Sequence, residues 1–273
     1  MKQKVFLLSL LLGVSIVSSA QKLTRVWSTT DGLKTPESVL YDTQSNLIYV
    51  TNIDGDASKK DGNGFISILN GDGKMNKLKW VTGLNAPKGQ AIHGGNLYVA
   101  DIDELVIINI KDAKINQRIK VENAKFLNDV TASDDGTIFF TDSKDTKIYA
   151  YANGKLSVWL EDKLVNNPNG IWAEKGKLYI GTEQLLEADI KTKALNPLVD
   201  KCGGIDGLEK IGDNQFIYSN WQGRIFVTKG KESIKLLDTV DKQNTADIDY
   251  VPGKNLVLVP TFGANSVDAY ELK

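Results

Sequence analysis

The apolar residues of this chain fall into short runs that are separated by turn residues. A polar step is followed by an apolar run, a turn, and a second apolar run that ends in a small or polar pair, and this order occurs six times. Runs of this length, bounded by glycine, asparagine and aspartate, are typical of short antiparallel strands rather than helices. The pattern therefore predicts an all-β protein built from repeats.

Two independent markers share the repeat. The polar steps are Pro36-Glu37-Ser38, Pro87-Lys88-Gly89, Leu127-Asn128-Asp129, Pro168-Asn169-Gly170, Ile205-Asp206-Gly207 and Ala246-Asp247-Ile248. Their central residues are 51, 40, 41, 37 and 41 positions apart. The second apolar runs end at Thr51-Asn52, Ala100-Asp101, Thr141-Asp142, Gly181-Thr182, Ser219-Asn220 and Pro260-Thr261. A period of about 40 residues with several strands per unit is typical of β-propeller blades.

The strand count predicts how the ring closes. Each unit has two further strand-like runs, such as residues 147–151 and 156–160 around the turn Asn153-Gly154. The last unit has room for only three strands before Lys273, whereas residues 23–29 form an unassigned strand. We predict a six-bladed β-propeller with four antiparallel strands per blade, in which residues 23–29 complete the last blade and leave no open edge. Trp27 supports this prediction because Trp80 and Trp159 lie at the matching place in their own units.

The first strand of each blade lines the central channel, so the central residues of the six polar steps should meet near one mouth. They are Glu37, Lys88, Asn128, Asn169, Asp206 and Asp247. Three carboxylates and one ammonium group leave a formal excess of −2, which one divalent cation would offset. Carboxylate and amide oxygens favour calcium, with magnesium, zinc or manganese as open alternatives. In the competing interpretation the channel binds only water and Lys88 neutralises an acid directly.

The polar loop over residues 53–64 follows the second strand of the first unit, so it should overhang the same mouth. It is rich in glycine, as expected of a lid.

Composition and the first residues restrict location and partners. The formal net charge is −1, with both signs scattered along the chain, which indicates no nucleic-acid or anionic-membrane surface. Lys2 and Lys4, an apolar run over residues 5–17 and the small residues before Gln21 predict a signal peptide over residues 1–20 that is cleaved near Ala20. We therefore expect one domain over residues 21–273, periplasmic or secreted and without a membrane anchor.

Two residue types occur once each and exclude several mechanisms. His93 is the one histidine, and its place in the turn His93-Gly94-Gly95 predicts a surface position. A histidine-based catalytic triad or zinc site is thereby disfavoured. Cys202 is the one cysteine, so no internal disulfide is possible, and a small buried thiol is expected there.

The quoted residues resemble those of the senescence marker protein and gluconolactonase family of six-bladed propellers. The resemblance rests on Glu37 in TPESVLYD, Asn128 in FLNDV, Asn169 in NPNGI and Asp206 in GGIDGLE. It implies that these four side chains hold one divalent cation. It also implies that Asp206 acts as the acid or base in the hydrolysis of a lactone.

Two departures from the family pattern bear on the substrate. Many sugar-lactone members have an arginine two residues before the third-blade asparagine, whereas this chain has Phe126 with Lys125 beside it. Lys88 adds a cation that the resemblance does not account for. We therefore expect either a hydrolase of a lactone or related ester, with a small-molecule substrate, or a non-enzymatic propeller that binds a small ligand or a partner protein.

Three further residues are candidates near the channel. Trp221 directly follows Ser219-Asn220, the end of the second strand in the fifth unit. There it could form an aromatic wall for a ligand or pack between blades. Asp129 and Asp247 are candidate second-sphere or proton-transfer groups, with a structural hydrogen bond as the alternative role.

Overall fold

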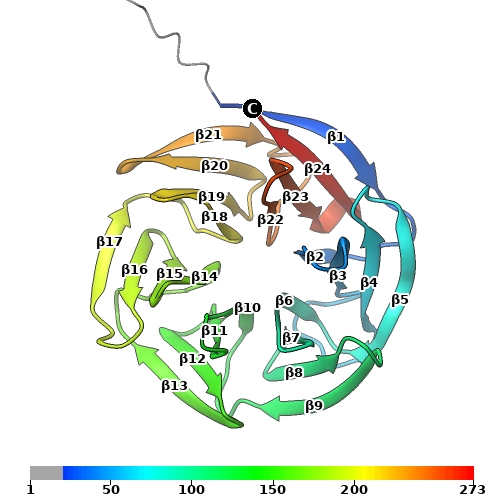
Figure 1. Ribbon diagram of the computed structural model, residues 1–273, viewed down its shortest axis with the longest axis horizontal. Helices are drawn as coiled ribbons and strands as arrows, with labels where there is room; N and C mark the ends of the chain where they lie inside the picture. The colour runs from blue at the N-terminus through cyan, green and yellow to red at the C-terminus, as the bar shows by residue number, and fades with distance from the viewer. Residues whose placement is uncertain (1–20) are drawn as a thin grey trace, which may run out of the picture.

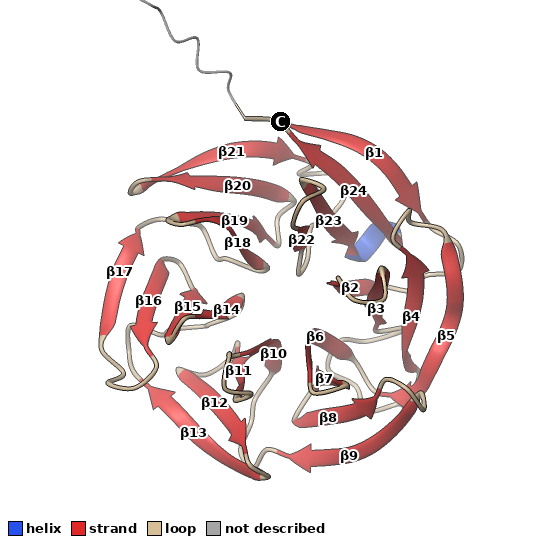
Figure 2. Cartoon of the chain, in the orientation of Figure 1, coloured by secondary structure: helices blue, strands red, loops and turns tan. Residues whose placement is uncertain are grey.

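The computed structural model describes residues 21–273, and the predicted signal peptide over residues 1–20 lies outside them. Figure 1 shows six sheets arranged around a central axis, each with one strand nearest that axis. Figure 2 shows that strands make up almost all of the ring, with a single short 3₁₀ helix, η1 (Phe262–Ala264), among the described residues. The prediction of an all-β, six-bladed propeller is confirmed.

Blades 1 to 5 each consist of four consecutive strands that run outward from the channel. Blade 1 contains β2 (Pro36–Asp42), β3 (Leu47–Asn52), β4 (Gly64–Asn70) and β5 (Met75–Leu84). Blade 2 contains β6 (Pro87–His93), β7 (Asn96–Asp101), β8 (Glu104–Asn109) and β9 (Lys114–Lys120). Blade 3 contains β10 (Leu127–Ala132), β11 (Ile138–Asp142), β12 (Lys147–Ala152) and β13 (Lys155–Glu161). Blade 4 contains β14 (Ile171–Glu174), β15 (Lys177–Gly181), β16 (Leu185–Asp189) and β17 (Leu195–Val199). Blade 5 contains β18 (Leu208–Gly212), β19 (Gln215–Asn220), β20 (Arg224–Lys229) and β21 (Glu232–Asp238).

Blade 6 joins the two ends of the described chain. It contains β22 (Asp249–Val251), β23 (Leu256–Thr261), β24 (Ser266–Leu272) and β1 (Leu23–Thr29). The outermost strand, β1, is antiparallel to β24, and Figure 1 shows these two strands side by side. The backbone amides of Lys22 and Lys273 each donate to the carbonyl of the other, both at 3.0 Å. The predicted closure by the N-terminal strand is therefore correct.

The hydrophobic core lies between blades. Six clusters of buried side chains each combine residues of two neighbouring blades, so each blade interface has one. Middle strands such as β4 are buried on both faces and read as nearly continuous apolar sequence. Outer strands such as β9 are mostly exposed, and only Ile115 and Ile119 of β9 are half-buried, because one face of the strand meets solvent. This small number of apolar positions explains why the outer strands gave a weaker sequence signal.

The polar steps lie where the backbone departs from a regular ladder. In blades 1 to 3 the register shifts at this point, for example between Pro36 and Val39. We expected the inner strands of blades 4 to 6 to open at the polar steps as well, but the regular strands begin later, at Ile171, Leu208 and Asp249. Backbone bonds still continue outside them, as from the amide of Asp206 to the carbonyl of Ser219 at 2.9 Å. Such bulges re-aim a side chain, here toward the channel.

None of the helices in residues 21–273 has the length and apolar character needed to span a membrane.

The contribution of β1 to ring closure can be tested at Trp27. Its ring packs on the cluster between blades 6 and 1, and it lies so close to Gly73 that a Cβ added there would be 2.6 Å from it. We expect Trp27→Ala to lower the free energy of unfolding by about 2–3 kcal/mol, because the lost side chain joins two blades. Denaturant unfolding followed by circular dichroism measures this. Val26→Ala on the same strand is the matched control, since Val26 is 48% exposed; equal effects of both variants would contradict this role of Trp27.

Candidate functional site

The channel contains two cavities, one toward each mouth. The first, of about 290 Å³, is lined by Glu37, Ile53, Ala57, Lys88, Phe126, Asn128, Asn169, Asp206, Trp221 and Phe262. The second, of about 170 Å³, lies further along the inner strands and is lined by residues that include Gln90, Asp129, Trp172, Glu209 and Asp247. Five of the six central residues of the polar steps therefore share one cavity, whereas the sequence predicted that all six would meet.

Asp247 is the exception, because it lines the second cavity together with Asp129. One Asp247 oxygen accepts a hydrogen bond from the Ser38 hydroxyl at 2.6 Å. The two Asp129 oxygens accept from the amides of Val130 and Ile171, both at 2.7 Å. These contacts join neighbouring inner strands, which agrees with the structural alternative for both residues. Asp247 does not join the other five because its side chain is turned to the next inner strand.

Glu37 and Asp206 are the two carboxylates of the first cavity. Their residues are only 5% and 6% exposed. Glu37 Oε2 is buried and has no hydrogen-bond partner. Asp206 Oδ1 accepts from Asn169 Nδ2 at 2.6 Å. Burial raises the pKa of Asp206 to about 7, and burial followed by the nearby Asp206 charge raises the pKa of Glu37 well above its usual range. The cavity thus concentrates acidic oxygens that lack full compensation.

Lys88 is almost completely buried, yet it does not neutralise these acids by direct contact. Its Nζ donates to the carbonyls of Ala57 and Ala86, both at 3.0 Å, and lies 4.3 Å from the Phe126 ring centroid. No ion pair joins Lys88 to an acid of the described chain. Burial lowers the Lys88 pKa, and the Glu37 charge opposes that shift. The interpretation in which Lys88 pairs directly with an acid is therefore not what the structure shows.

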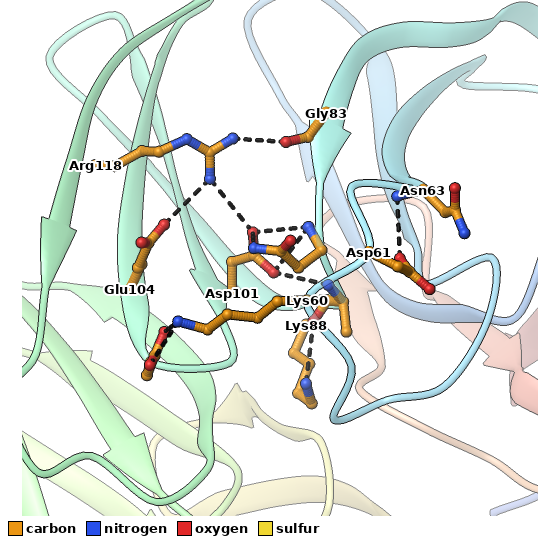
Figure 3. Close-up of polar contacts among 11 residues, drawn as sticks. Lys60, Asp61, Asn63, Gly83, Lys88, Asp101, Glu104 and Arg118 are labelled. Carbon is orange, nitrogen blue, oxygen red and sulfur yellow. Dashed lines mark hydrogen bonds and ion pairs between the residues drawn. The ribbon is translucent and has the colours of Figure 1, made fainter.

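The loop over residues 53–63 covers part of this mouth, as predicted, and Ile53 and Ala57 line the cavity. Two of its contacts reach blade 2: Lys88 binds the Ala57 carbonyl, and Lys60 Nζ donates to Asp103 Oδ2 at 2.7 Å. Figure 3 shows Lys60 and Lys88 beside the loop, with the Asp61 carboxylate accepting from the Asn63 amide. The loop is therefore a tethered cover rather than a free one.

Apolar side chains form the walls above the polar floor. Trp221 is 44% exposed, and its ring meets that of Phe262 edge to face, with centroids 4.7 Å apart at 76°. Trp221 thus lines the cavity and also packs against blade 6, so its position is compatible with both roles that the sequence left open. Phe126 also lines the cavity, whereas Lys125 Nζ is directed to Asp145 at 3.3 Å. Lys125 consequently does not replace the missing arginine.

Sequence reasoning missed Phe262 as a lining residue, although a signal was present. Phe262 directly follows Thr261, just as Trp221 follows Asn220 and Ile53 follows Asn52. The residue after the second strand is thus a lining position in blades 1, 5 and 6. In the second cavity, Gln90 and Glu209 were missed because they lie two and three positions beyond the central residues of their polar steps, Lys88 and Asp206.

The second-strand ends hold the segments that deliver the channel residues. Asp101 accepts from the amides of Asn85 and Ala86, just before Lys88, as Figure 3 shows in part. Asp142 accepts from the amides of Lys125 and Phe126 in the equivalent place in blade 3. These bonds agree with a structural role for the recurring polar pairs.

The donors of the first cavity were tested against a divalent cation. No group of three or more His, Cys, Asp and Glu side chains in residues 21–273 is arranged to hold a metal ion. The expected set relies instead on two carboxylates and two amides, Glu37, Asp206, Asn128 and Asn169, which all line this cavity. The unpartnered Glu37 Oε2 is the feature that a cation would satisfy. An oxygen-rich set of this kind fits calcium or magnesium better than zinc.

The two residues that occur once lie outside this site. His93 ends β6 at the opposite end of the strand from Lys88 and is exposed, as predicted. Cys202 is buried, and burial raises the pKa of its thiol. Neither lines the first cavity.

The tether from Lys88 can be tested with an internal control. Lys88→Met keeps the apolar stem but removes both hydrogen bonds, so we expect faster amide hydrogen exchange over residues 53–63. Lys144→Met is the control, because Lys144 Nζ also lies 4.3 Å from the Phe126 centroid but is exposed. Exchange rates in this loop that are unchanged in Lys88→Met would exclude the tether.

The buried carboxylates predict a pH dependence of stability. Burial raises the pKa of Asp249, whose carboxylate accepts from the Tyr41 amide, to about 7. A raised pKa in the folded state contributes stability that is complete below the unfolded value near 4 and is lost as pH rises through about 7. The chelator-treated protein should therefore melt at a lower temperature at pH 8 than at pH 5. Asp249→Asn should flatten this dependence by roughly 2–4 kcal/mol, whereas exposed Asp213→Asn should not; equal slopes in thermal melts would contradict it.

The chain was compared with known proteins. No family model matches the sequence, and a search of curated proteins finds no relative. Solved structures do match over nearly the whole length. A candidate gluconolactonase has a TM-score of 0.67 at 15% identity and covers 93% of each chain. A gluconolactonase from Xanthomonas campestris has a TM-score of 0.67 at 12% identity over 89% of this chain and 88% of its own.

Streptogramin B lyases share the fold as well. One such structure has a TM-score of 0.66 at 13% identity and covers 93% of this chain and 98% of its own. A virginiamycin B lyase from Staphylococcus aureus, with a TM-score of 0.59 at 14% identity over 93% of this chain and all of its own, is described as catalytically inactive after a histidine-to-alanine substitution. At these identities the likeness concerns the fold. The chain has a gluconolactonase-like six-bladed propeller fold, and the lyase structures are similar to it over nearly its whole length.

Proposed function

We propose that this protein is a divalent-cation-dependent hydrolase of a lactone or a related ester, with the reaction in the first cavity. One observation carries the proposal: Glu37 Oε2 is buried without a partner beside Asp206, while Lys88 is held by two backbone carbonyls instead. The residues that would hold the cation are Glu37, Asn128, Asn169 and Asp206. Calcium suits these oxygen donors best, and magnesium, manganese or zinc are the alternatives.

The bound cation would polarise the carbonyl of the ester and lower the pKa of the attacking water. Asp206 would take a proton from that water as its oxygen bonds to the carbonyl carbon, and would return the proton to the alkoxide when the carbon–oxygen ester bond breaks. Asn169 Nδ2 holds Asp206 Oδ1, which leaves Oδ2 for the proton. The covering loop and the Trp221 wall would limit bulk water around these groups.

The second candidate is a non-enzymatic propeller that binds a small ligand or a partner protein in the same cavity. A lyase reaction that depends on a histidine is not supported, because His93 is exposed at the far end of β6 and does not line the cavity. The proposed export to the periplasm or outside the cell rests on the sequence of residues 1–20 alone.

The proposal is tested by metal content, thermal melting and activity measured on the same samples. Wild-type protein should contain one divalent cation and melt at a lower temperature after chelation. Asp206→Asn and Glu37→Gln should lose the cation and the chelator effect, because each removes one anionic donor. A panel of lactones and esters should be hydrolysed by the loaded wild type only, with at least a hundredfold loss in Asp206→Asn.

Asp213→Asn provides the matched control, since it removes an exposed carboxylate of blade 5 outside the cavity. Wild-type protein that takes up no divalent cation and melts identically with and without chelator would refute the metal site. A bound cation without turnover of any lactone or ester would instead support the ligand-binding candidate.

A further inference from the structure

The walls of the first cavity restrict the kind of molecule that fits it. Above the polar floor, the lining consists of Ile53, Ala57, Phe126, Trp221 and Phe262. Ile53 also belongs to a small buried cluster with Ala86 and Ile102, with Ala57 and Phe262 packed against it. No Ser, Thr, Tyr, Arg or His side chain lines this cavity within the described chain. The walls of this cavity therefore present mainly apolar surface. An adjoining pocket of about 250 Å³ shares Asn169, Asp206 and Trp221 with it and is more polar, with Ser143 and Glu183 among its lining.

Two polar side chains of the cavity, Lys88 and Asn169, already have partners, and the remaining three, Glu37, Asn128 and Asp206, are proposed cation ligands. Lys88 donates to the Ala57 and Ala86 carbonyls and faces the Phe126 ring. Asn169 Nδ2 donates to Asp206, which in turn is assigned to the reaction. A ligand with several hydroxyl groups that is held within the first cavity would leave them unpaired against its apolar walls, and burying an unpaired polar group is unfavourable.

The Trp221 ring has a defined orientation in the apolar wall. Its indole is held edge to face against Phe262 and remains 44% exposed at the cavity. The other exposed large apolar residues lie on outermost strands or in a loop at the rim, as with Val158 in β13 and Leu164. An aromatic side chain fixed at a cavity mouth is suited to contact with a flat apolar ring.

From these contacts we infer that the substrate is a small lactone or ester that carries an aromatic or other apolar ring, and not a polyhydroxylated sugar lactone. The inference rests on the proposed function, from which the lactone or ester group is taken. The carbonyl would face Asp206 and Glu37 on the floor, and the ring would contact Trp221 and Phe262. A cavity of about 290 Å³ is at the small end of ligand pockets, which suits one or two fused rings.

Two lactams that are not hydrolysed test the ligand preference separately from catalysis. Dihydroquinolinone has the shape of an aromatic six-membered lactone, and gluconolactam has that of a sugar lactone. Isothermal titration of calcium-loaded and chelator-treated protein should give at least tenfold tighter binding of dihydroquinolinone. Trp221→Ala should weaken that binding at least fivefold, while Leu164→Ala, which alters an exposed apolar residue elsewhere, should leave it unchanged.

Circular dichroism verifies the fold of each variant, and Phe262→Leu is the second wall variant if Trp221→Ala does not fold. Tighter or equal binding of gluconolactam would overturn the inference, as would binding of dihydroquinolinone that neither wall variant alters. Turnover of a sugar lactone with no turnover of aromatic lactones would keep the hydrolase and refute this substrate class. Binding of dihydroquinolinone that depends on Trp221, with no lactone turned over, would uphold the ligand class and refute the hydrolase.

Discussion

The inner edge of each blade imposes the main constraint on this structure. The innermost strand has a neighbour on one side only, so its other edge meets the channel, where backbone amides need acceptors. Side chains of adjacent blades supply several of them: Asp129 accepts from the Ile171 amide, Thr131 from the Ala173 amide, and Asp249 from the Tyr41 amide. Between blades 6 and 1 the edges also pair directly, as a parallel bridge of Ser38 and Asp247. The carboxylates of Asp129 and Asp249 are buried because they accept hydrogen bonds from the inner-edge amides of neighbouring blades.

This constraint separates five of the channel acids into two groups. Asp129, Asp247 and Asp249 bind groups of the next inner strand, and their role in holding blades together is sufficient to explain their burial. Glu37 retains an oxygen without a partner, and Asp206 is bonded only through Asn169. Buried polar atoms without a partner occur in both cavities, Glu37 Oε2 in the first and Gln90 Oε1 and Trp172 Nε1 in the second. Glu37 is the one acid among them that lines the first cavity, where Lys88 binds the covering loop and makes no direct contact with an acid of residues 21–273. The acids that hold the blades together are therefore different from those of the proposed site.

The sequence determined the ring more firmly than the details of the channel. The number of blades and the closing strand followed from two markers with a common period, because each blade must repeat the same burial to pack on its neighbours. Asp247 was misplaced because a bulge decides which way a side chain turns, and register at a bulge depends on contacts with the neighbouring blade. Phe262 followed the same positional rule as Trp221, yet the rule was visible only once the cavity was known. The partner of the Lys88 ammonium group depends on where the covering loop places the Ala57 carbonyl, and the sequence does not predict that position.

The pairing of β1 with β24 also determines how the molecule would respond to load. Lys22 and Lys273 are hydrogen-bonded to each other at the outer rim, so anything attached at these two points departs from one place on the circumference. Tension between them would act on antiparallel strands that run side by side in blade 6. The mouth with Glu37 and Asp206 lies at the axis, away from that point. The propeller can therefore be held by its rim while its cavity stays free to meet small molecules.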